Sequence, residues 1–194
     1  MGLTAIRNVY LRLSSGCVSS LYRRPHASRG PTVDDPIVSI ENTRFEVDQN
    51  PALEYVARQF AKAFGYTADL EVNPALAQLL RLRVSQVNNC TYCLNLHYEV
   101  ARNLGIHRGK IDTLTACWET DLLEPSEQTA LAYTEALTRI ADTTVEDRFE
   151  PYHRELAAHV SESEVVEIAG IVINMNVWTL LKLAQGATPT LDQI

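Results

Sequence analysis

Residues 73–97, NPALAQLLRLRVSQVNNCTYCLNLH, predict two consecutive helices separated by a short turn. Asn73 is a favourable N-cap, and Pro74 takes the first helical position, where its missing N–H costs nothing. Leucines and a valine follow at three- and four-residue steps, which is typical of the buried side of a helix. The next helix begins near Cys90 and ends before Gly105, because glycine is a common helix terminator.

The same signals recur on both sides of this stretch. Asn50-Pro51 repeats the Asn-Pro helix start, and Gly65 ends that helix. Ser126 is the expected cap of a later helix. Capping boxes are expected where Thr144 precedes Asp147 and where Ser161 precedes Glu164. We therefore expect helices at about 51–64, 74–87, 90–104, 108–118, 126–140 and 162–185. No segment alternates long enough to require a sheet, so the sequence predicts an all-α fold.

The composition fits one globular domain. The chain has 194 residues, of which 46% are hydrophobic, and its net charge is −7 at pH 7. An acidic chain of this kind lacks the dense basic surface that nucleic acid or anionic membrane requires. We therefore expect neither nucleic acid nor membrane as a partner.

The N-terminal segment differs from the rest of the chain. The first 33 residues contain no Asp or Glu, but five Arg and five Ser. This composition resembles an organellar transit peptide, although an extension that contributes nothing to the fold is the simpler interpretation. We expect an arm over residues 1–35, a helical domain over 36–194 and a cytoplasmic protein. An organellar or exported location for the precursor stays open.

An apolar run over residues 165–184 is long enough to cross a membrane. Four polar residues interrupt it, and a helix buried on most sides within the protein explains it better. The four are Glu167, Asn174, Asn176 and Lys182.

Cys90 and Cys93 form a CxxC motif at the expected start of a helix. In the first turn, Cys93 lies near unpaired backbone N–H groups and the positive end of the helix dipole, which favour the reactive thiolate. Cys90 lies one turn back on the same face, where it can form a disulfide with Cys93. His97 follows four residues later on that face and can exchange a proton when sulfur attacks or leaves.

Two other interpretations of the three residues stay open at this point. They could be small or buried core residues without chemistry. They could also bind a metal ion, because Cys and His are good zinc ligands. A closed zinc site would need a fourth ligand such as Cys117, His107 or a carboxylate from elsewhere in the fold.

Residues 80–97, LRLRVSQVNNCTYCLNLH, resemble the core of the carboxymuconolactone decarboxylase / AhpD-like alkylhydroperoxidase superfamily. The similarity extends from about Phe45 to Gly186. It implies an all-α, AhpD-like helical bundle that assembles as trimers or hexamers. In the peroxidase branch the second cysteine is peroxidatic and the first is resolving, which implies these roles for Cys93 and Cys90. The family histidine corresponds to His97, and the paired cysteines favour this branch over the decarboxylases.

One position departs from the family pattern. The proton-relay glutamate of the family lies twelve residues before the first cysteine, where this chain has Gln78. Glutamine can form hydrogen bonds but cannot accept a proton at neutral pH. Glu71, Glu99 or a carboxylate of a neighbouring subunit would have to replace it.

The sequence thus predicts a peroxidase-like oxidoreductase that reduces hydroperoxides with Cys93, Cys90 and His97 and an external dithiol reductant. We expect no cofactor, no metal and a homo-oligomer. The alternatives are a helical redox sensor or scaffold with little turnover because of Gln78, and the Cys/Cys/His metal site.

Overall fold

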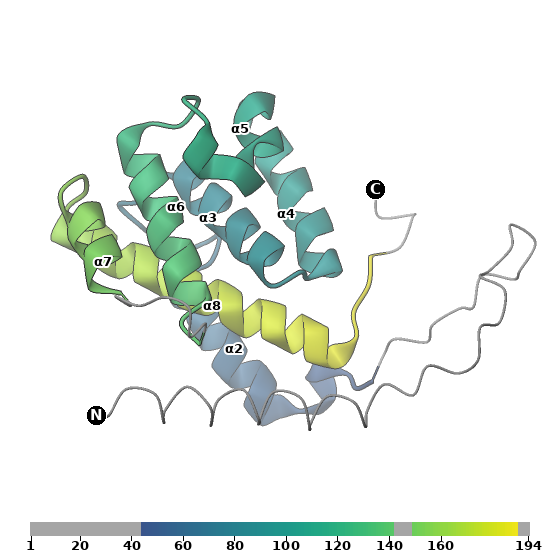
Figure 1. Ribbon diagram of the computed structural model, residues 1–194. Helices are drawn as coiled ribbons and strands as arrows, with labels where there is room; N and C mark the ends of the chain where they lie inside the picture. Colours follow the sequence, from purple (N-terminus) through teal and green to yellow (C-terminus); the bar gives the residue numbers. More distant parts are fainter. Residues whose placement is uncertain (1–43, 142–148, 190–194) are drawn as a thin grey trace, which may run out of the picture. The chain divides into compact units, whose positions relative to one another are not determined.

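The computed structural model describes residues 44–141 and 149–189, and these ranges contain helices and no strand (Figure 1). The predicted all-α class is therefore confirmed. The elements are η1 (Val47–Gln49), α2 (Pro51–Phe64), α3 (Pro74–Val87), α4 (Thr91–Asn103), α5 (Arg108–Asp112), η2 (Leu114–Glu119), α6 (Pro125–Thr138), α7 (Glu150–Ala157) and α8 (Glu162–Gln185).

Helix α3 is the centre of the core. It packs against α4, α6 and α8, and every residue from Leu76 to Ser85 is buried. The predicted buried positions on this helix are therefore confirmed, and even its polar side chains lie inside. The main apolar cluster joins α3 to α6 and to the first half of α8. A second cluster joins Val84, Cys90 and Cys93 to Val172 and Met175 of α8.

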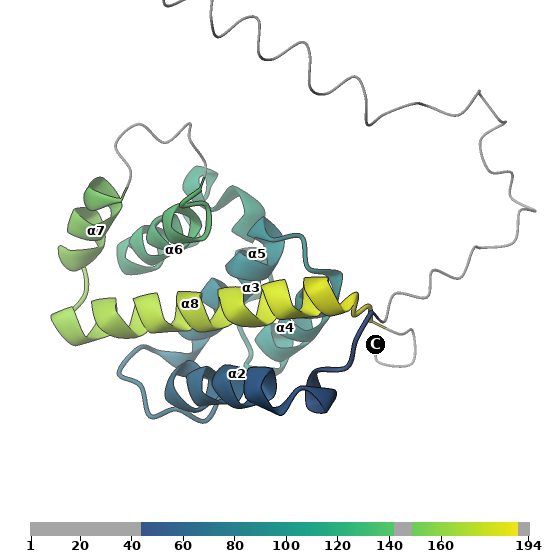
Figure 2. The same ribbon diagram turned by 90° about the horizontal axis from the view of Figure 1, so that it is seen from below.

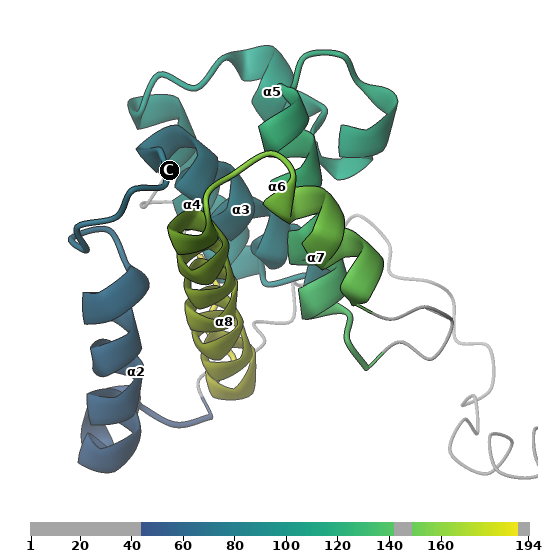
Figure 3. The ribbon, with the colours of Figure 1, turned by 90° about the vertical axis from the view of Figure 1, so that its left-hand side faces the viewer.

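Helix α8 lies between α2 on one side and α6 and α7 on the other (Figures 2 and 3). Among the described residues it is the one helix long and apolar enough to cross a membrane, but half of its apolar stretch is buried within the protein. The expectation that it is buried on most sides is only partly right. Val166, Ile173 and Leu180, which are 61%, 43% and 60% exposed, follow each other at seven-residue steps and so form a stripe on α8 that the described helices leave uncovered.

The helix boundaries agree with the predicted caps at most positions. Asn50 and Asn73 accept hydrogen bonds from the first turns of α2 and α3 through their side chains. Ser161 and Glu164 form the predicted capping box, and Gly186 ends α8 with φ 77°. These caps depend on contacts within a few residues, which explains why the sequence alone identifies them.

Two helix predictions are wrong. The segment 108–118 is divided into α5 and η2 at Thr113, and η2 itself contains a kink at Ala116, which has non-helical φ and ψ angles. Helix α6 is capped by Glu124 rather than Ser126, since Pro125 takes the first helical position and the Glu127 side chain accepts from the Glu124 N–H. The capping box expected at Thr144 and Asp147 lies outside the described residues.

The boundary between the predicted arm and the helical domain also lies outside the described residues. The division into 1–35 and 36–194 therefore stays a prediction, as does the assembly into trimers or hexamers.

Candidate functional site

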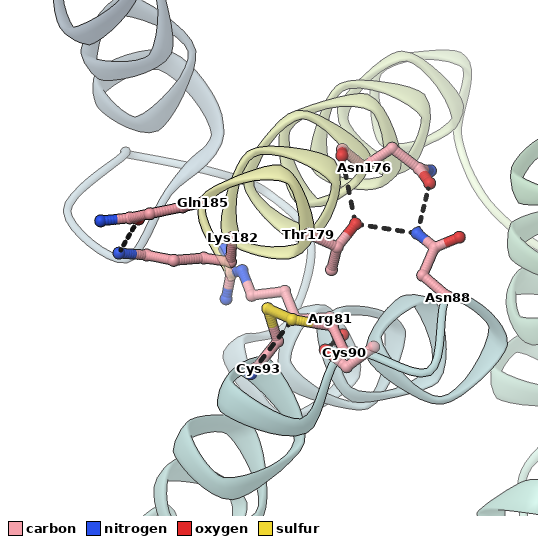
Figure 4. The surroundings of a disulfide bond; sticks show 9 residues. Arg81, Asn88, Cys90, Cys93, Asn176, Thr179, Lys182 and Gln185 are labelled. Atoms are coloured by element: carbon pink, nitrogen blue, oxygen red, sulfur yellow. Dashed lines mark hydrogen bonds between the residues drawn. A yellow bond between two sulfur atoms is a disulfide. The ribbon is translucent and has the colours of Figure 1, made fainter. Parts of the chain in front are cut away.

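The turn between α3 and α4 fixes the position of both cysteines. Asn89 has φ 51°, a left-handed conformation that asparagine tolerates better than most residues. The Asn88 side chain donates to Asn176 Oδ1 and Thr179 Oγ1 of α8, both at 2.8 Å. Figure 4 shows these hydrogen bonds on the Cys90 side of the thiol pair. The turn is thus held to α8 through side-chain amides and a hydroxyl.

Cys90 is the N-cap of α4, and Cys93 lies in the first turn, as predicted. The Cys93 N–H donates to Cys90 Sγ at 3.3 Å, and the two sulfurs are joined in a disulfide. Their Cα atoms are 5.3 Å apart. The residues are only 1% and 3% exposed. A thiolate released here would face the free N–H groups of the helix start, which stabilise negative charge on sulfur.

A cavity of about 380 Å³ gives access to Cys93. Helices α2, α3, α4 and α8 all contribute to its wall. Besides Cys93, its lining includes Tyr66, Arg81, His97, Trp178 and Lys182. The peroxidatic candidate is therefore buried but reachable, whereas Cys90 does not line this cavity.

His97 lies on the wall of this cavity, and a short hydrogen-bond network fixes its ring. The Tyr66 hydroxyl lies 2.8 Å from His97 Nδ1, and Gln78 Nε2 lies 3.2 Å from the same atom. Gln78 Nε2 also donates to the main-chain oxygen of His97 at 2.8 Å, which fixes the orientation of the amide. Because an amide N–H thus faces Nδ1, this nitrogen accepts hydrogen bonds and the ring proton lies on Nε2.

The His97 imidazole is neutral in this environment. Burial lowers the pKa of His97 to about 3, and the positive charge of Arg81 adds to this effect. The sequence predicted a histidine that can both accept and donate a proton. With its pKa this low, His97 is a weak base, and its contribution is a hydrogen bond or a proton donated from Nε2.

The lowered pKa of His97 predicts a pH-dependent stability in the disulfide form. The unfolded chain binds the proton near pH 6.5, whereas the folded protein does not until about pH 3. The free energy of unfolding should therefore fall as the pH drops, by about 2 kcal/mol between pH 7 and pH 5. Urea unfolding at several pH values measures this. His97→Gln should remove most of this dependence of the unfolding free energy on pH. His153→Gln, at an exposed position of α7, is the control and should keep it. If both variants showed the same pH dependence, His97 would not be its source.

Gln78 occupies the position of the missing glutamate and contacts the candidate histidine directly. It is fully buried, and its Oε1 accepts no hydrogen bond from any residue that the structure describes. The proposed substitutes do not reach the site: Glu71 and Glu99 are exposed and do not line the cavity. No described carboxylate therefore takes the place of the family glutamate.

The residues considered as a fourth metal ligand lie elsewhere. Cys117 is buried next to Glu135, where burial and the carboxylate raise its pKa to about 11, so its thiol stays protonated at neutral pH. His107 caps α5 by accepting from the Gly109 N–H. Within residues 44–141 and 149–189, no three His, Cys, Asp or Glu side chains gather as a metal site would require.

The sequence identified Cys93 and His97 but not the other residues that line the cavity, which include Tyr66, Arg81, Trp178 and Lys182. Arg81 follows Gln78 by three residues and so shares its helix face, a spacing that could have identified it. Tyr66 lies in the loop after Gly65, and no sequence pattern places a loop residue against a histidine 31 positions away.

Comparison with solved structures shows that the fold is shared with other proteins. The Agrobacterium tumefaciens protein of unknown function described as putative antioxidant defence protein AhpD has a TM-score of 0.67 and 22% identity, covering 76% of this chain and 99% of its own. The debrominase Bmp8, in complex with 2,3,4-tribromopyrrole, has a TM-score of 0.62 and 18% identity, covering 76% of this chain and 75% of its own. At these identities both structures establish a shared AhpD-like fold.

Sequence comparison identifies the family as well as the fold. Residues 54–136 match the carboxymuconolactone decarboxylase family. The uncharacterized protein YdfG of Bacillus subtilis (strain 168) is 34% identical over 121 residues, which cover 62% of this chain and 80% of YdfG. The chain therefore belongs to the carboxymuconolactone decarboxylase family.

Proposed function

We propose that the protein is a thiol-dependent peroxidase that reduces hydroperoxides with the Cys90–Cys93 pair. The observation that supports this most directly is a disulfide at the start of α4 whose second sulfur belongs to a residue lining a cavity. The description of the Agrobacterium protein as a putative antioxidant defence protein agrees with this proposal. The assembly as a homo-oligomer, the cytoplasmic location and the need for an external dithiol belong to the same proposal.

The first step is the attack of the Cys93 thiolate on the terminal oxygen of the hydroperoxide. An S–O bond forms while the O–O bond breaks, and the alkoxide leaves as an alcohol after it receives a proton. His97 lines the cavity and can donate its Nε2 proton to the alkoxide while the Tyr66 hydroxyl protonates Nδ1. The Tyr66 oxygen then regains a proton from water, so that the histidine and the tyrosine are both neutral again. Cys93 becomes a sulfenic acid.

The second step forms the disulfide. The Cys90 sulfur attacks the sulfenic sulfur of Cys93, an S–S bond forms, the S–O bond breaks and water leaves. An external dithiol then reduces the pair by two thiol–disulfide exchanges and is itself oxidised to a disulfide. No bound cofactor takes part.

The proposal is tested by counting thiols before and after oxidation. The fully reduced chain contains four cysteines. One equivalent of an organic hydroperoxide should remove two thiols within the first turnover, and mass spectrometry should find both in the peptide that contains Cys90 and Cys93. Cys117→Ser serves as the control and should still lose two thiols; a protein that keeps all its thiols would overturn the proposal.

A second candidate function is a redox sensor or scaffold with slow turnover. The buried contact between Gln78 and His97, together with the low pKa of His97, favours it, because no carboxylate among the described residues lines the cavity to support proton transfer. This candidate predicts the same disulfide but no catalytic consumption of peroxide. Peroxide consumption by the parent protein in an excess of dithiol reductant separates the two: many turnovers support the peroxidase, and consumption that stops after about one turnover supports the sensor or scaffold.

A further inference from the structure

Arg81 is a buried cation that no described carboxylate neutralises. Arg81 is 5% exposed, and its Nη2 donates to the main-chain oxygens of Phe64 and Gly65 at 3.2 and 3.1 Å. The guanidinium lies 4.7 Å from the centre of the Tyr66 ring. These partners are neutral, so they satisfy hydrogen bonds but leave the charge uncompensated.

Arg83, two residues further along α3, provides an internal comparison. It is 4% exposed, as deeply buried as Arg81, but its Nε and Nη2 lie 2.7 and 2.6 Å from Glu135 Oε1. Buried charges are normally paired in this way, because an unpaired ion in a protein interior is expensive. The same helix therefore carries one neutralised arginine and one without a counter-charge.

The unpaired arginine faces the candidate active site. Arg81 lines the cavity together with Cys93 and His97. Its Nε and Nη1 form no hydrogen bond with any residue that the structure describes, and neither is among the fully enclosed polar atoms without a partner. Figure 4 shows the Arg81 side chain beside the disulfide. Arg81 thus has N–H donors without a described partner and contributes to the wall of the cavity that Cys93 lines.

A second cation and an apolar wall complete the cavity. Lys182 of α8 lines it, with its Nζ 4.8 Å from the centre of the Tyr92 ring and 3.2 Å from the Gln185 amide oxygen. Leu96, Met175 and Trp178 supply apolar surface, and no Asp or Glu is among its lining residues. A cavity with two cations, no acid and aromatic walls is complementary to an amphipathic anion.

We propose that the Cys93 cavity selects a carboxylate-bearing, otherwise apolar organic hydroperoxide, with Arg81 and Lys182 binding the carboxylate. This inference rests on the proposed function, of which it names the substrate class. A guanidinium holds a carboxylate with two parallel N–H bonds, and the free Nε and Nη1 of Arg81 are the donors for such a pair. The apolar wall then receives the hydrocarbon part and leaves the peroxide beside Cys93.

Ligand binding tests the inference without any turnover. The oxidised protein is used because it contains no Cys93 thiolate, which would itself be an anion for Arg81. In a Trp118→Phe background, Trp178 fluorescence reports binding of 4-isopropylbenzoate and of its neutral isostere 4-isopropylbenzamide. The carboxylate should bind about tenfold more tightly or better; equal dissociation constants would overturn the proposal.

Variants assign the preference to the two cations. Arg81→Gln should abolish the preference for the carboxylate over the amide, and Arg81→Lys should retain part of it. Lys182→Gln should weaken this preference, but less than Arg81→Gln does. Lys182 is only partly buried, so this variant keeps the test available if Arg81→Gln does not fold. Arg108→Gln, which removes an 88% exposed cation outside the cavity, is the control and should change nothing. A preference that survives both Arg81→Gln and Lys182→Gln would also refute the assignment.

Kinetics distinguish this inference from the proposed function. Cumene hydroperoxide and the same molecule with a para-carboxylate differ only by that carboxylate group. The protein should prefer the carboxylate form through a lower KM, and Arg81→Gln should raise that KM without a similar change for the neutral substrate. Carboxylate binding without turnover of either peroxide would refute only the peroxidase, whereas equal turnover of both without carboxylate binding would refute only the substrate class.

Discussion

Cys93→Ser should lower kcat/KM for hydroperoxide reduction by about a thousandfold or more, because serine offers no anionic nucleophile at neutral pH. The position of Cys93 makes the thiolate of the parent protein favourable: it lies in the first turn of α4 and lines the cavity. The disulfide cannot form in this variant either. The rate of peroxide loss, followed with an excess of dithiol reductant, measures the effect.

Cys90→Ser provides the matched comparison, since it removes only the second sulfur. A first turnover should still occur and should stop at a Cys93 sulfenic acid, which a sulfenic-acid-specific reagent detects by mass. Cys117→Ser should leave all steps unchanged, because that thiol lies in another part of the core. If Cys90→Ser lost the first step and Cys93→Ser kept it, the two roles would have to be exchanged.

The sequence predicted those parts of the fold that depend on neighbours along the chain. The Asn-Pro starts of α2 and α3 and the Ser161–Glu164 box are set by contacts within one helical turn. The same reasoning placed Cys90, Cys93 and His97 on one face of α4. Cys93 and His97 line the same cavity, and the disulfide joins Cys93 to Cys90, which caps the helix without lining that cavity.

The remaining features depend on residues that are distant in sequence. The break between α5 and η2 buries Leu114 and Cys117 against other helices, which no local preference reveals. Likewise, the neutral state of His97 results from burial and from Arg81 on another helix. A spacing of four residues predicts that a histidine and a cysteine share a face, but it does not predict the pKa of the imidazole.

Gln78→Glu should raise kcat/KM by about a hundredfold, at the lower end of what general acid–base catalysis contributes. A carboxylate at this position would lie next to His97 Nδ1, where Gln78 Nε2 is 3.2 Å away. Its negative charge would raise the pKa of His97 from about 3 toward neutrality. The imidazole would then gain the ability to accept a proton from a thiol and to donate it to the leaving alkoxide.

Gln78→Glu should also lower the free energy of unfolding, so a faster but less stable protein is expected. Gln78 Nε2 donates to the His97 main-chain oxygen at 2.8 Å, and a carboxylate cannot replace this donor, so the loss should be about 1–3 kcal/mol. Rate, urea stability and the His97 titration are measured together. Gln86→Glu, on the same helix but outside the cavity, is the control and should leave the rate unchanged. A folded Gln78→Glu protein with a raised His97 pKa and no gain in rate would mean that the missing carboxylate is not what limits turnover.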